Sequence, residues 1–269
     1  MFTFIPRMER QFYKYHGAGN DFILFDNCQK PPLSFSQALI ASWCRRRFGI
    51  GADGFISIEN SQTADFYMRY YNADGNVSTM CGNGGRCAVA FAHRIGLIDT
   101  DCTFEAADGL HHASLGAEGL VKLGMQDVKY VAQASTHCFV DTGSPHHVLF
   151  QTNINSLDVA LLGREIRYGA PYFEAGTNVN FVELEDENRF LIRTYERGVE
   201  GETSACGTGA VAAALSAYTL GHTNSKTVKI DTKGGLLTVS FEPQNEGFKN
   251  ITLTGPTVFV CQITLNINE

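Results

Sequence analysis

The stretch Met80–Cys87, MCGNGGRC, returns in shorter form at Ala205–Ala210, ACGTGA, with the two leading cysteines at positions 81 and 206. In both places a cysteine precedes a glycine-rich turn and then an alanine-rich segment with a helical pattern. We therefore expect Cys81 and Cys206 each to lie at a helix N-terminus. Free backbone N–H groups and partial positive charge at such a position favour the thiolate, so both thiols are suited to acid–base chemistry.

Other residues repeat at nearly the same offset, which indicates a duplicated domain. The pairs are Tyr70 and Tyr195, Asn72 and Arg197, Gly82 and Gly207, Gly84 and Gly209, Gly96 and Gly221, Gly51–Asp53 and Gly176–Asn178, and Gly17–Asn20 and Gly143–His146, the last displaced by one residue. Glycine favours the position just past a helix, where φ is positive, so Gly96 and Gly221 predict two helices of roughly 12 residues.

Length and composition are typical of two globular domains, because 269 residues with 44% hydrophobic content can form two cores. We expect one domain to span residues 1–132, completed by a C-terminal strand over 262–269, and the other to span 133–261. A net charge of −7 argues against nucleic-acid and anionic-membrane partners. No apolar run is long enough to span a bilayer, and eight cysteines are too few for a dense disulfide framework, which favours a reducing cytoplasm.

The hydrophobic pattern predicts an α+β fold in which each half is a mostly antiparallel sheet wrapped around its cysteine-bearing helix. A further helix is expected from Ser36 to about Arg46, capped by Ser34 or Ser36. Arg45–Arg47 then reads as the solvated end of that helix. The strand-like runs are 21–25, 54–58, 64–71, 179–184 and 190–195.

Two related halves that face each other would place one thiol on either side of a cleft. Inverting a carbon centre requires a base on one face and an acid on the other, with roles that exchange with the substrate's handedness. A cofactor-free enzyme of this type must stabilise the carbanion with hydrogen bonds and dipoles, which two helix N-termini can supply. The duplication therefore favours a racemase or epimerase.

The chain resembles the diaminopimelate epimerase family along almost its whole length. The resemblance is carried by the motifs HGAGNDF (16–22), GIGADG (49–54), NADG (72–75), MCGNG (80–84), GTNV (176–179), YERG (195–198) and GETSACGTG (201–209). It implies an isomerase that interconverts LL- and meso-diaminopimelate without pyridoxal phosphate, for lysine and cell-wall precursor synthesis. It also implies two pseudo-symmetric domains, no cofactor, and a homodimer.

The resemblance assigns a role to each matching residue of this sequence. Cys81 and Cys206 correspond to the catalytic acid/base pair, and His146 and Glu196 to the residues that tune the pKa of the thiols. The residues that correspond to the substrate-binding set are Asn20, Asn72, Gly82, Asn83, Asn178, Glu196, Arg197, Gly207 and Thr208. Ser144 stands where the family often has Asn, and Gly54 where some members have Gln, so neither is included in the set.

Alternatives remain for the function and for the other cysteines. A related racemase of proline or hydroxyproline would carry His after the first Cys-Gly, where this chain has Asn83. A non-catalytic or metal-binding protein of the same fold would be expected to have lost one thiol. No metal site is predicted, because Cys138, His146 and His147 fit no standard zinc spacing. The cysteines expected to be small buried hydrophobes are Cys28, Cys44, Cys102, Cys138 and Cys261, and Cys87 is expected to be structural.

Overall fold

The structure, a computed structural model that describes residues 7–268, contains two compact units. The first unit runs up to Gly119 and takes in the C-terminal segment from Thr257, and the second is Leu120–Pro256. The predicted division at 132/133 and 261/262 thus differs from the observed one. The reason is that Leu120–Gly124 pairs with a strand of the second unit, which extends that unit toward the N-terminus.

The first unit is built on a mixed sheet in the order β18–β1–β2–β3–β4–β6–β7, with β5 added beside β4. Its strands are β1 (Arg7–Gly17), β2 (Asn20–Asp26), β3 (Gly54–Glu59), β4 (Phe66–Asn72), β5 (Val77–Ser78), β6 (Asp101–Ala106), β7 (Gly109–Leu115) and β18 (Val258–Asn268). Its helices are α1 (Gln37–Cys44), α2 (Gly82–Arg94) and the 3-10 turn η1 (Ala117–Gly119). The C-terminal strand β18 pairs with β1 and so completes this sheet.

The second unit has the order β9–β10–β11–β12–β13–β15–β16–β17–β8, with β14 added beside β13. Its strands are β8 (Leu120–Gly124), β9 (Ala132–Gln133), β10 (Cys138–Asp141), β11 (Pro145–Phe150), β12 (Asn178–Asp186), β13 (Arg189–Glu196), β14 (Gly201–Thr203), β15 (Thr227–Thr232), β16 (Gly235–Gln244) and β17 (Gly247–Pro256). Its helices are η2 (Ile154–Ser156), α3 (Val159–Tyr168) and α4 (Gly207–Thr219).

The two sheets share one topology over their central strands, and the second sheet continues beyond them with β17 and β8. In the first unit, β1 to β7 pair in the sequence antiparallel, parallel, antiparallel, parallel, antiparallel, and β10 to β16 repeat it in the second. The short strands β5 and β14 occupy equivalent places, directly before the cysteine-bearing helices. The duplication inferred from scattered residues is therefore present in the fold.

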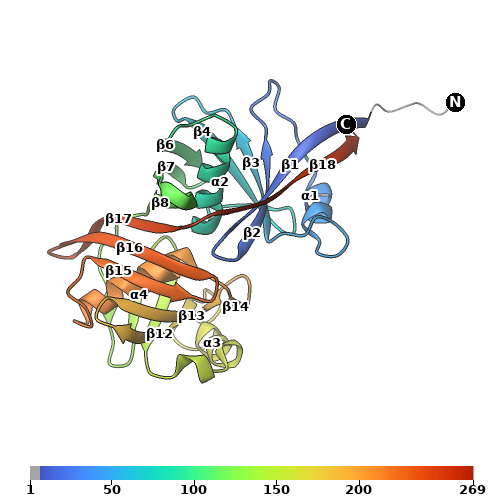
Figure 1. The fold of residues 1–269 in the computed structure, drawn as a ribbon. Coiled ribbons are helices and arrows are strands. Elements are labelled where there is room, and N and C mark those ends of the chain that lie inside the picture. The colour runs from blue at the N-terminus through green and yellow to red at the C-terminus, as the bar shows by residue number, and fades with distance from the viewer. Residues whose placement is uncertain (1–6, 269) are drawn as a thin grey trace. The chain divides into compact units, whose positions relative to one another are not determined.

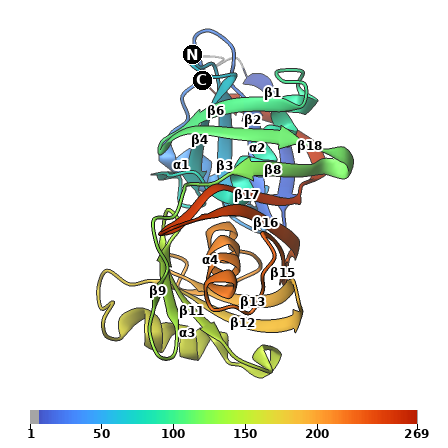
Figure 2. The ribbon, with the colours of Figure 1, turned by 90° about the vertical axis from the view of Figure 1, so that its left-hand side faces the viewer.

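Each sheet curls around one apolar helix. Helix α4 contacts strands from β10 through β17, which surround it in Figure 2, and helix α2 contacts β1, β2, β3, β4 and β7 of its own unit. Both helices are almost wholly buried over their first ten residues. A second core in the first unit joins α1 to the outer face of the sheet through a cluster of aromatic rings that includes Phe12, Trp43 and Phe55. Within residues 7–268 no helix is long and apolar enough to cross a membrane.

The predicted elements match the observed ones closely. The five predicted strand runs fall on β2, β3, β4, β12 and β13, and α1 begins after Ser36, whose side chain accepts a hydrogen bond from the Leu39 N–H. Gly96 and Gly221 have φ of 75° and 74°, and each lies two residues past the end of a 13-residue helix.

Two side-chain predictions need correction. Cys44, Cys102 and Cys138 are buried as predicted, but Cys261 on β18 is exposed and Cys28 is only partly buried. The basic run Arg45–Arg47 is exposed as predicted, and Arg46 also pairs with the carboxylates of Asp21 and Asp53.

Candidate active site

Both candidate cysteines occupy the N-cap position of a helix, although neither side chain makes a capping hydrogen bond. Cys81 is the N-cap of α2 and Cys206 the N-cap of α4, each with extended backbone angles. The Gly85 N–H donates to the Cys81 carbonyl over 2.7 Å, and the Ala210 N–H donates to the Cys206 carbonyl over 2.9 Å. The preceding N–H groups of each first turn have no partner within the helix, which makes each N-terminus suited to an anion.

The glycines of the motif are explained by close packing. A Cβ at Gly209 would lie 2.6 Å from Asn180 Oδ1 and 3.3 Å from Cys206 Sγ. A Cβ at Gly84, the equivalent position, would lie 3.3 Å from the Ile56 side chain. The glycine therefore lets the sheet approach the first turn of the helix in both units.

In the first unit, two amides gather at the thiol. Cys81 Sγ lies 3.7 Å from Asn20 Oδ1, and Asn83 Nδ2 donates to the same oxygen over 3.3 Å. The sequence placed these three residues in one site, and the structure brings them together. Asn72, the fourth predicted member in this unit, ends β4 with an exposed side chain and lies outside this hydrogen-bonded group of described residues.

Charged residues hold the two amides in place. Asn20 Nδ2 donates to the Asp53 carboxylate over 2.7 Å, and Arg46 bridges Asp53 to Asp21. At the other end, Arg86 donates to Asn83 Oδ1 over 2.8 Å and to the Gly82 carbonyl over 3.2 Å, although its side chain is wholly buried. Burial lowers the pKa of Arg86, while neighbouring Cys87 and Cys81 act to raise it.

In the second unit, the thiol meets hydroxyls and an imidazole. Cys206 Sγ lies 3.4 Å from Thr208 Oγ1, which in turn lies 3.0 Å from His146 Nε2. Ser144 Oγ lies 3.0 Å from the same ring nitrogen and 3.3 Å from Thr208 Oγ1. His146 is fully buried, and burial lowers its pKa to about 3, so the ring is neutral at physiological pH.

The remaining predicted residues lie at the ends of strands. Asn178 begins β12; it accepts from the backbone N–H of Arg197 over 2.9 Å and donates to Ser144 Oγ over 3.3 Å. The guanidinium of Arg197 donates to the Ala175 carbonyl and is otherwise exposed. Glu196 ends β13 and accepts from the Thr203 hydroxyl.

Four residues near the two thiols were not part of the predicted site. Ser144, left out because it replaces an amide, belongs to the hydrogen-bonded group around Cys206. Asn180 contacts the far side of the His146 ring through a 3.0 Å bond and was missed, although it follows Asn178 by two and so shares its face of β12. Arg86 and Asp53 stood inside quoted motifs, but nothing local in the sequence shows that they hold amides.

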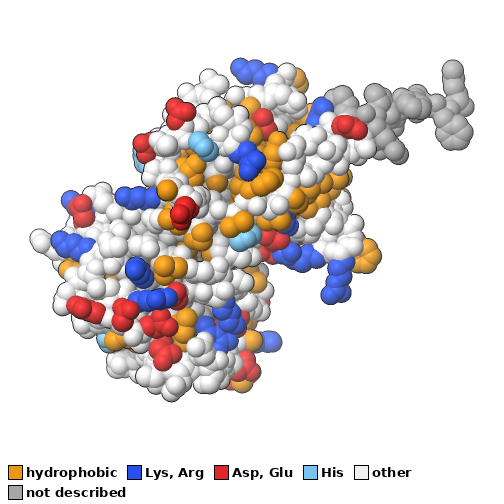
Figure 3. Space-filling model, in the orientation of Figure 1, with side chains coloured by type: hydrophobic (Ala, Val, Ile, Leu, Met, Phe, Trp, Pro, Cys, Tyr) orange, Lys and Arg blue, Asp and Glu red, His pale blue; other side chains and the backbone are white. Residues whose placement is uncertain are grey.

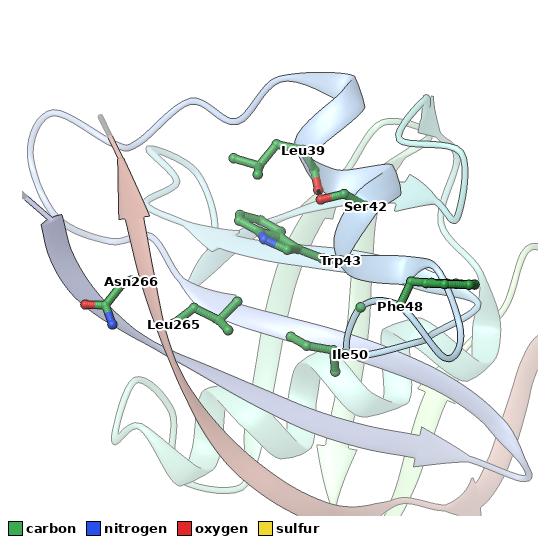
Figure 4. A pocket seen from close by; sticks show the side chains of 8 residues that line it. Leu39, Ser42, Trp43, Phe48, Ile50, Leu265 and Asn266 are labelled. Atoms are coloured by element: carbon green, nitrogen blue, oxygen red, sulfur yellow. Dashed lines mark hydrogen bonds between the residues drawn. The ribbon is translucent and has the colours of Figure 1, made fainter. Parts of the chain in front are cut away.

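No group of three or more His, Cys, Asp or Glu side chains within residues 7–268 is arranged to hold a metal ion. A hollow of about 640 Å³ lies elsewhere in the first unit, between α1 and β18, and Figure 4 shows Trp43 and Leu265 facing it. None of its lining side chains is ionisable, so it offers no acid or base. Figure 3 shows hydrophobic side chains gathered over β18, where Val258 and Val260 are about half exposed.

Comparison with known proteins decides the family. The family model described as diaminopimelate epimerase matches residues 12–131 and 138–260. The chain belongs to the diaminopimelate epimerase family. A relative from Flavobacterium psychrophilum named diaminopimelate epimerase is 50% identical over 255 residues, covering 95% of this chain and 100% of the relative. One of the same name from Chlorobaculum tepidum is 47% identical and covers 93% and 99%.

Solved structures show how widely the epimerase fold is shared. A phenazine biosynthesis protein of the PhzF family from Bacillus anthracis has a TM-score of 0.74 at 14% identity, covering 97% of this chain and 100% of that one. A hydroxyproline epimerase from Agrobacterium vitis has a TM-score of 0.68 at 16% identity, covering 97% and 93%. At such identities the likeness shows the fold alone.

Proposed function

We propose that this chain interconverts LL- and meso-diaminopimelate without a cofactor, in lysine and cell-wall precursor synthesis, and that Cys81 and Cys206 are its acid/base pair. The observation that carries the proposal is the duplicated N-cap. Cys81 and Cys206 occupy the N-cap positions of two helices of equal length, and each helix packs against a sheet with the same order of central strands. Membership of the diaminopimelate epimerase family supports the substrate.

In the proposed reaction, one cysteine acts as a thiolate and the other as a thiol. The thiolate takes the α-proton, and the electron pair of the broken C–H bond stays on the carbon. The thiol then donates its proton to the opposite face, so that the chain ends with the two protonation states exchanged. The N–H groups of Gly82 and Asn83, and of Gly207 and Thr208, are proposed to bind the carboxylate next to the reacting carbon and to stabilise the charge that develops there.

The distal end of the substrate is assigned to the polar residues at the strand ends. We propose that Asn20, Asn72, Asn178 and Arg197 bind it, with Arg197 suited to a two-bond contact with a carboxylate. His146 and Glu196 are proposed to tune the thiols, and Glu196 also to contact the substrate. The direct line of contacts from His146 through Thr208 to Cys206 supports this role for His146.

The deciding experiment is exchange of the α-proton in deuterated water with purified protein and either LL- or meso-diaminopimelate, with proline as the comparison substrate. We expect exchange and epimerisation with diaminopimelate only. Cys81→Ala and Cys206→Ala should each abolish epimerisation, because each face of the carbon depends on one sulfur.

The exposed Cys261 provides the matched control, since Cys261→Ala removes a thiol without touching either helix N-terminus. It should retain full activity. Substantial epimerisation by either folded active-site variant would rule out the two-thiol mechanism, and racemisation of proline would move the chain to the other substrate class.

Two further properties are proposed, the oligomeric state and the compartment. A homodimer is supported by the half-exposed apolar side chains along β18, and light scattering of the purified protein tests it. A reducing compartment such as the cytoplasm is supported by the need of the mechanism for two thiols in reduced form, and none of the described cysteines forms a disulfide.

A further inference from the structure

The hydrogen-bond directions around Cys206 follow from groups that can act in only one way. Asn178 accepts at Oδ1 from the backbone N–H of Arg197, and donates at Nδ2 to the Pro145 carbonyl over 3.0 Å. A backbone N–H cannot accept and a carbonyl cannot donate, so the orientation of this amide is fixed. Its Nδ2 therefore also donates to Ser144 Oγ, which must accept there.

The ring nitrogen of His146 that carries the proton is determined in the same way. Asn180 donates at Nδ2 to the His147 carbonyl over 3.2 Å, while the Thr194 hydroxyl donates to Asn180 Oδ1 over 3.0 Å. The amide thus presents Nδ2 to His146 Nδ1, 3.0 Å away, and that ring nitrogen must accept. A neutral imidazole with an accepting Nδ1 carries its proton on Nε2. A proton on Nδ1 would place two donors against each other.

The remaining hydroxyl protons can then be assigned one after another. The Nε2–H of His146 points to Thr208 Oγ1 and Ser144 Oγ, each 3.0 Å away. Since Nε2 has no free lone pair, the Ser144 hydroxyl donates to Thr208 Oγ1. Thr208 Oγ1 then accepts twice, and the partner that remains for its own proton is Cys206 Sγ.

We infer that Asn180 is a positioning residue that, through the Nε2–H form of His146, turns the Thr208 hydroxyl to donate to Cys206 and so stabilises the Cys206 thiolate. Asn180 lies on β12, and its oxygen is held by Thr194 on the adjacent strand β13. The sheet thereby sets the direction of a hydrogen bond at the sulfur. The role of this bond in catalysis rests on the proposed function.

At Cys81 the hydrogen bond to the sulfur has the opposite direction. Asn20 donates at Nδ2 to the Asp53 carboxylate, and Arg86, which can only donate, occupies Asn83 Oδ1, so both amides are again fixed. Asn20 consequently turns Oδ1 toward Cys81 Sγ at 3.7 Å. An oxygen acceptor stabilises the thiol, because only the S–H form can donate to it. The duplication has thus produced one site with a donor for the sulfur and one with an acceptor.

Charged groups near the two sulfurs add to these effects. Arg86 on α2 favours the Cys81 thiolate and so opposes the Asn20 acceptor, while Arg197 at the end of β13 acts on His146 and favours its neutral form. Glu196, beside Arg197, is bound to the Thr203 hydroxyl. The inference is therefore tested by the change in thiol pKa when one partner is removed, with no substrate present.

The experiment measures the pH dependence of iodoacetamide alkylation at each cysteine by peptide mass spectrometry. Cys206 is followed in a Cys81→Ala background and Cys81 in a Cys206→Ala background, so that the two titrations are not coupled. A short cysteine peptide added to the reaction serves as the reference for an ordinary thiol. Thr208→Val removes the donor, Thr208→Ser restores it, and Asn180→Leu removes the group that sets the tautomer.

Thr208→Val should raise the pKa of Cys206 by about one to two units, a roughly ten- to hundredfold loss of thiolate at a given pH, since a hydrogen bond to a charged group is lost. Thr208→Ser should leave it unchanged, and Asn180→Leu should raise it by a smaller amount. Asn20→Ala should shift the pKa of Cys81 in the opposite direction, downward. Thr219→Val is the matched control, because it makes the same change at the far end of α4, where the hydroxyl binds Leu215.

The tautomer is measured independently in the unmutated protein. The nitrogen chemical shifts of His146 should show a proton on Nε2, and Asn180→Leu should disturb this preference. A proton on Nδ1 in the unmutated protein, or an unchanged Cys206 pKa in folded Thr208→Val, overturns the inference. Neither outcome depends on activity, so a wrong substrate assignment would be seen separately in the exchange experiment.

Discussion

Arg197 contacts the protein through both its backbone and its side chain. Its main-chain N–H fixes Asn178, and one guanidinium nitrogen donates to the Ala175 carbonyl over 2.9 Å. Arg197 is otherwise exposed, and the Asn178 amide that it fixes belongs to the hydrogen-bonded group around Cys206. Asn72, its counterpart in the sequence repeat, carries no charge. In the proposed function, this difference would distinguish the two ends of an asymmetric substrate.

Arg197→Lys keeps the charge but loses the planar two-bond contact, and the KM for diaminopimelate should rise by roughly tenfold or more, with a smaller change in kcat. Steady-state kinetics in both directions measure this. Arg189→Lys is the matched control, because Arg189 lies at the opposite end of β13 and pairs with Asp231. A KM equal to that of the unmutated protein would show that Arg197 does not bind the distal carboxylate.

The helix-terminal positions of the two proposed reactive cysteines could be predicted from sequence, whereas the residues around them could be predicted only in part. Cys81 and Cys206 could be placed at helix N-termini because a glycine-rich turn and an alanine-rich helix are local signals. Asn180 could not, since its function depends on which amide atom faces His146, and that is set by Thr194 on another strand. Ser144 was excluded by comparison with an amide, although a hydroxyl suits a position between Asn178 and Thr208.

At the scale of elements, helices α2 and α4 have the same kind of residue at their N-termini and just after their C-termini. Each starts at a cysteine cap and stops at a glycine with positive φ, Gly96 or Gly221, and a Cβ at either glycine would meet nothing within 4 Å. The cost of replacing these glycines is therefore purely conformational. This makes the two helix ends a matched pair for measuring the penalty of a left-handed residue.

Gly96→Ala and Gly221→Ala should each lower the free energy of unfolding by about 1 kcal/mol, since an L-residue with a Cβ is strained in the left-handed region. Urea unfolding followed by circular dichroism measures the change. Gly201→Ala is the control: its position is equally open but has no positive φ, so it should be neutral or slightly stabilising. Equal effects at all three positions would contradict the argument.

Helices and individual strands could be predicted because their signals are local, whereas the unit boundary could not. β8 joins the second unit by pairing with β17, and β18 joins the first by pairing with β1, with Lys14 opposite Cys261. Partners so distant in sequence leave no periodic trace in either strand alone. The C-terminal segment was predicted to return to the first unit from residue 262, and the observed change of unit comes earlier, at Thr257.

At the scale of the whole molecule, buried neutral histidines tie stability to pH. Burial lowers the pKa of His146 to about 3, and burial, with a contribution from His137, lowers that of His147 to about 4. The unfolded chain binds these protons at a pKa near 6.5, so below about pH 6.5 it holds more protons than the folded one. Stability is therefore fully present above that pH and falls as the solution becomes more acidic.

Between about pH 7.5 and pH 5.5, each histidine should remove roughly 1 kcal/mol from the free energy of unfolding. His147→Gln should flatten this slope by about half, since one of the two groups no longer takes up a proton on unfolding. The pKa of the Asp21 carboxyl is also lowered, to about 2, because Arg46 and Lys14 outweigh the opposing effect of burial. Its effect on the free energy of unfolding therefore appears only below about pH 4. Urea titrations at the two pH values measure the slope, and a stability that does not fall toward pH 5.5 would show that His146 and His147 can take up protons within the folded protein.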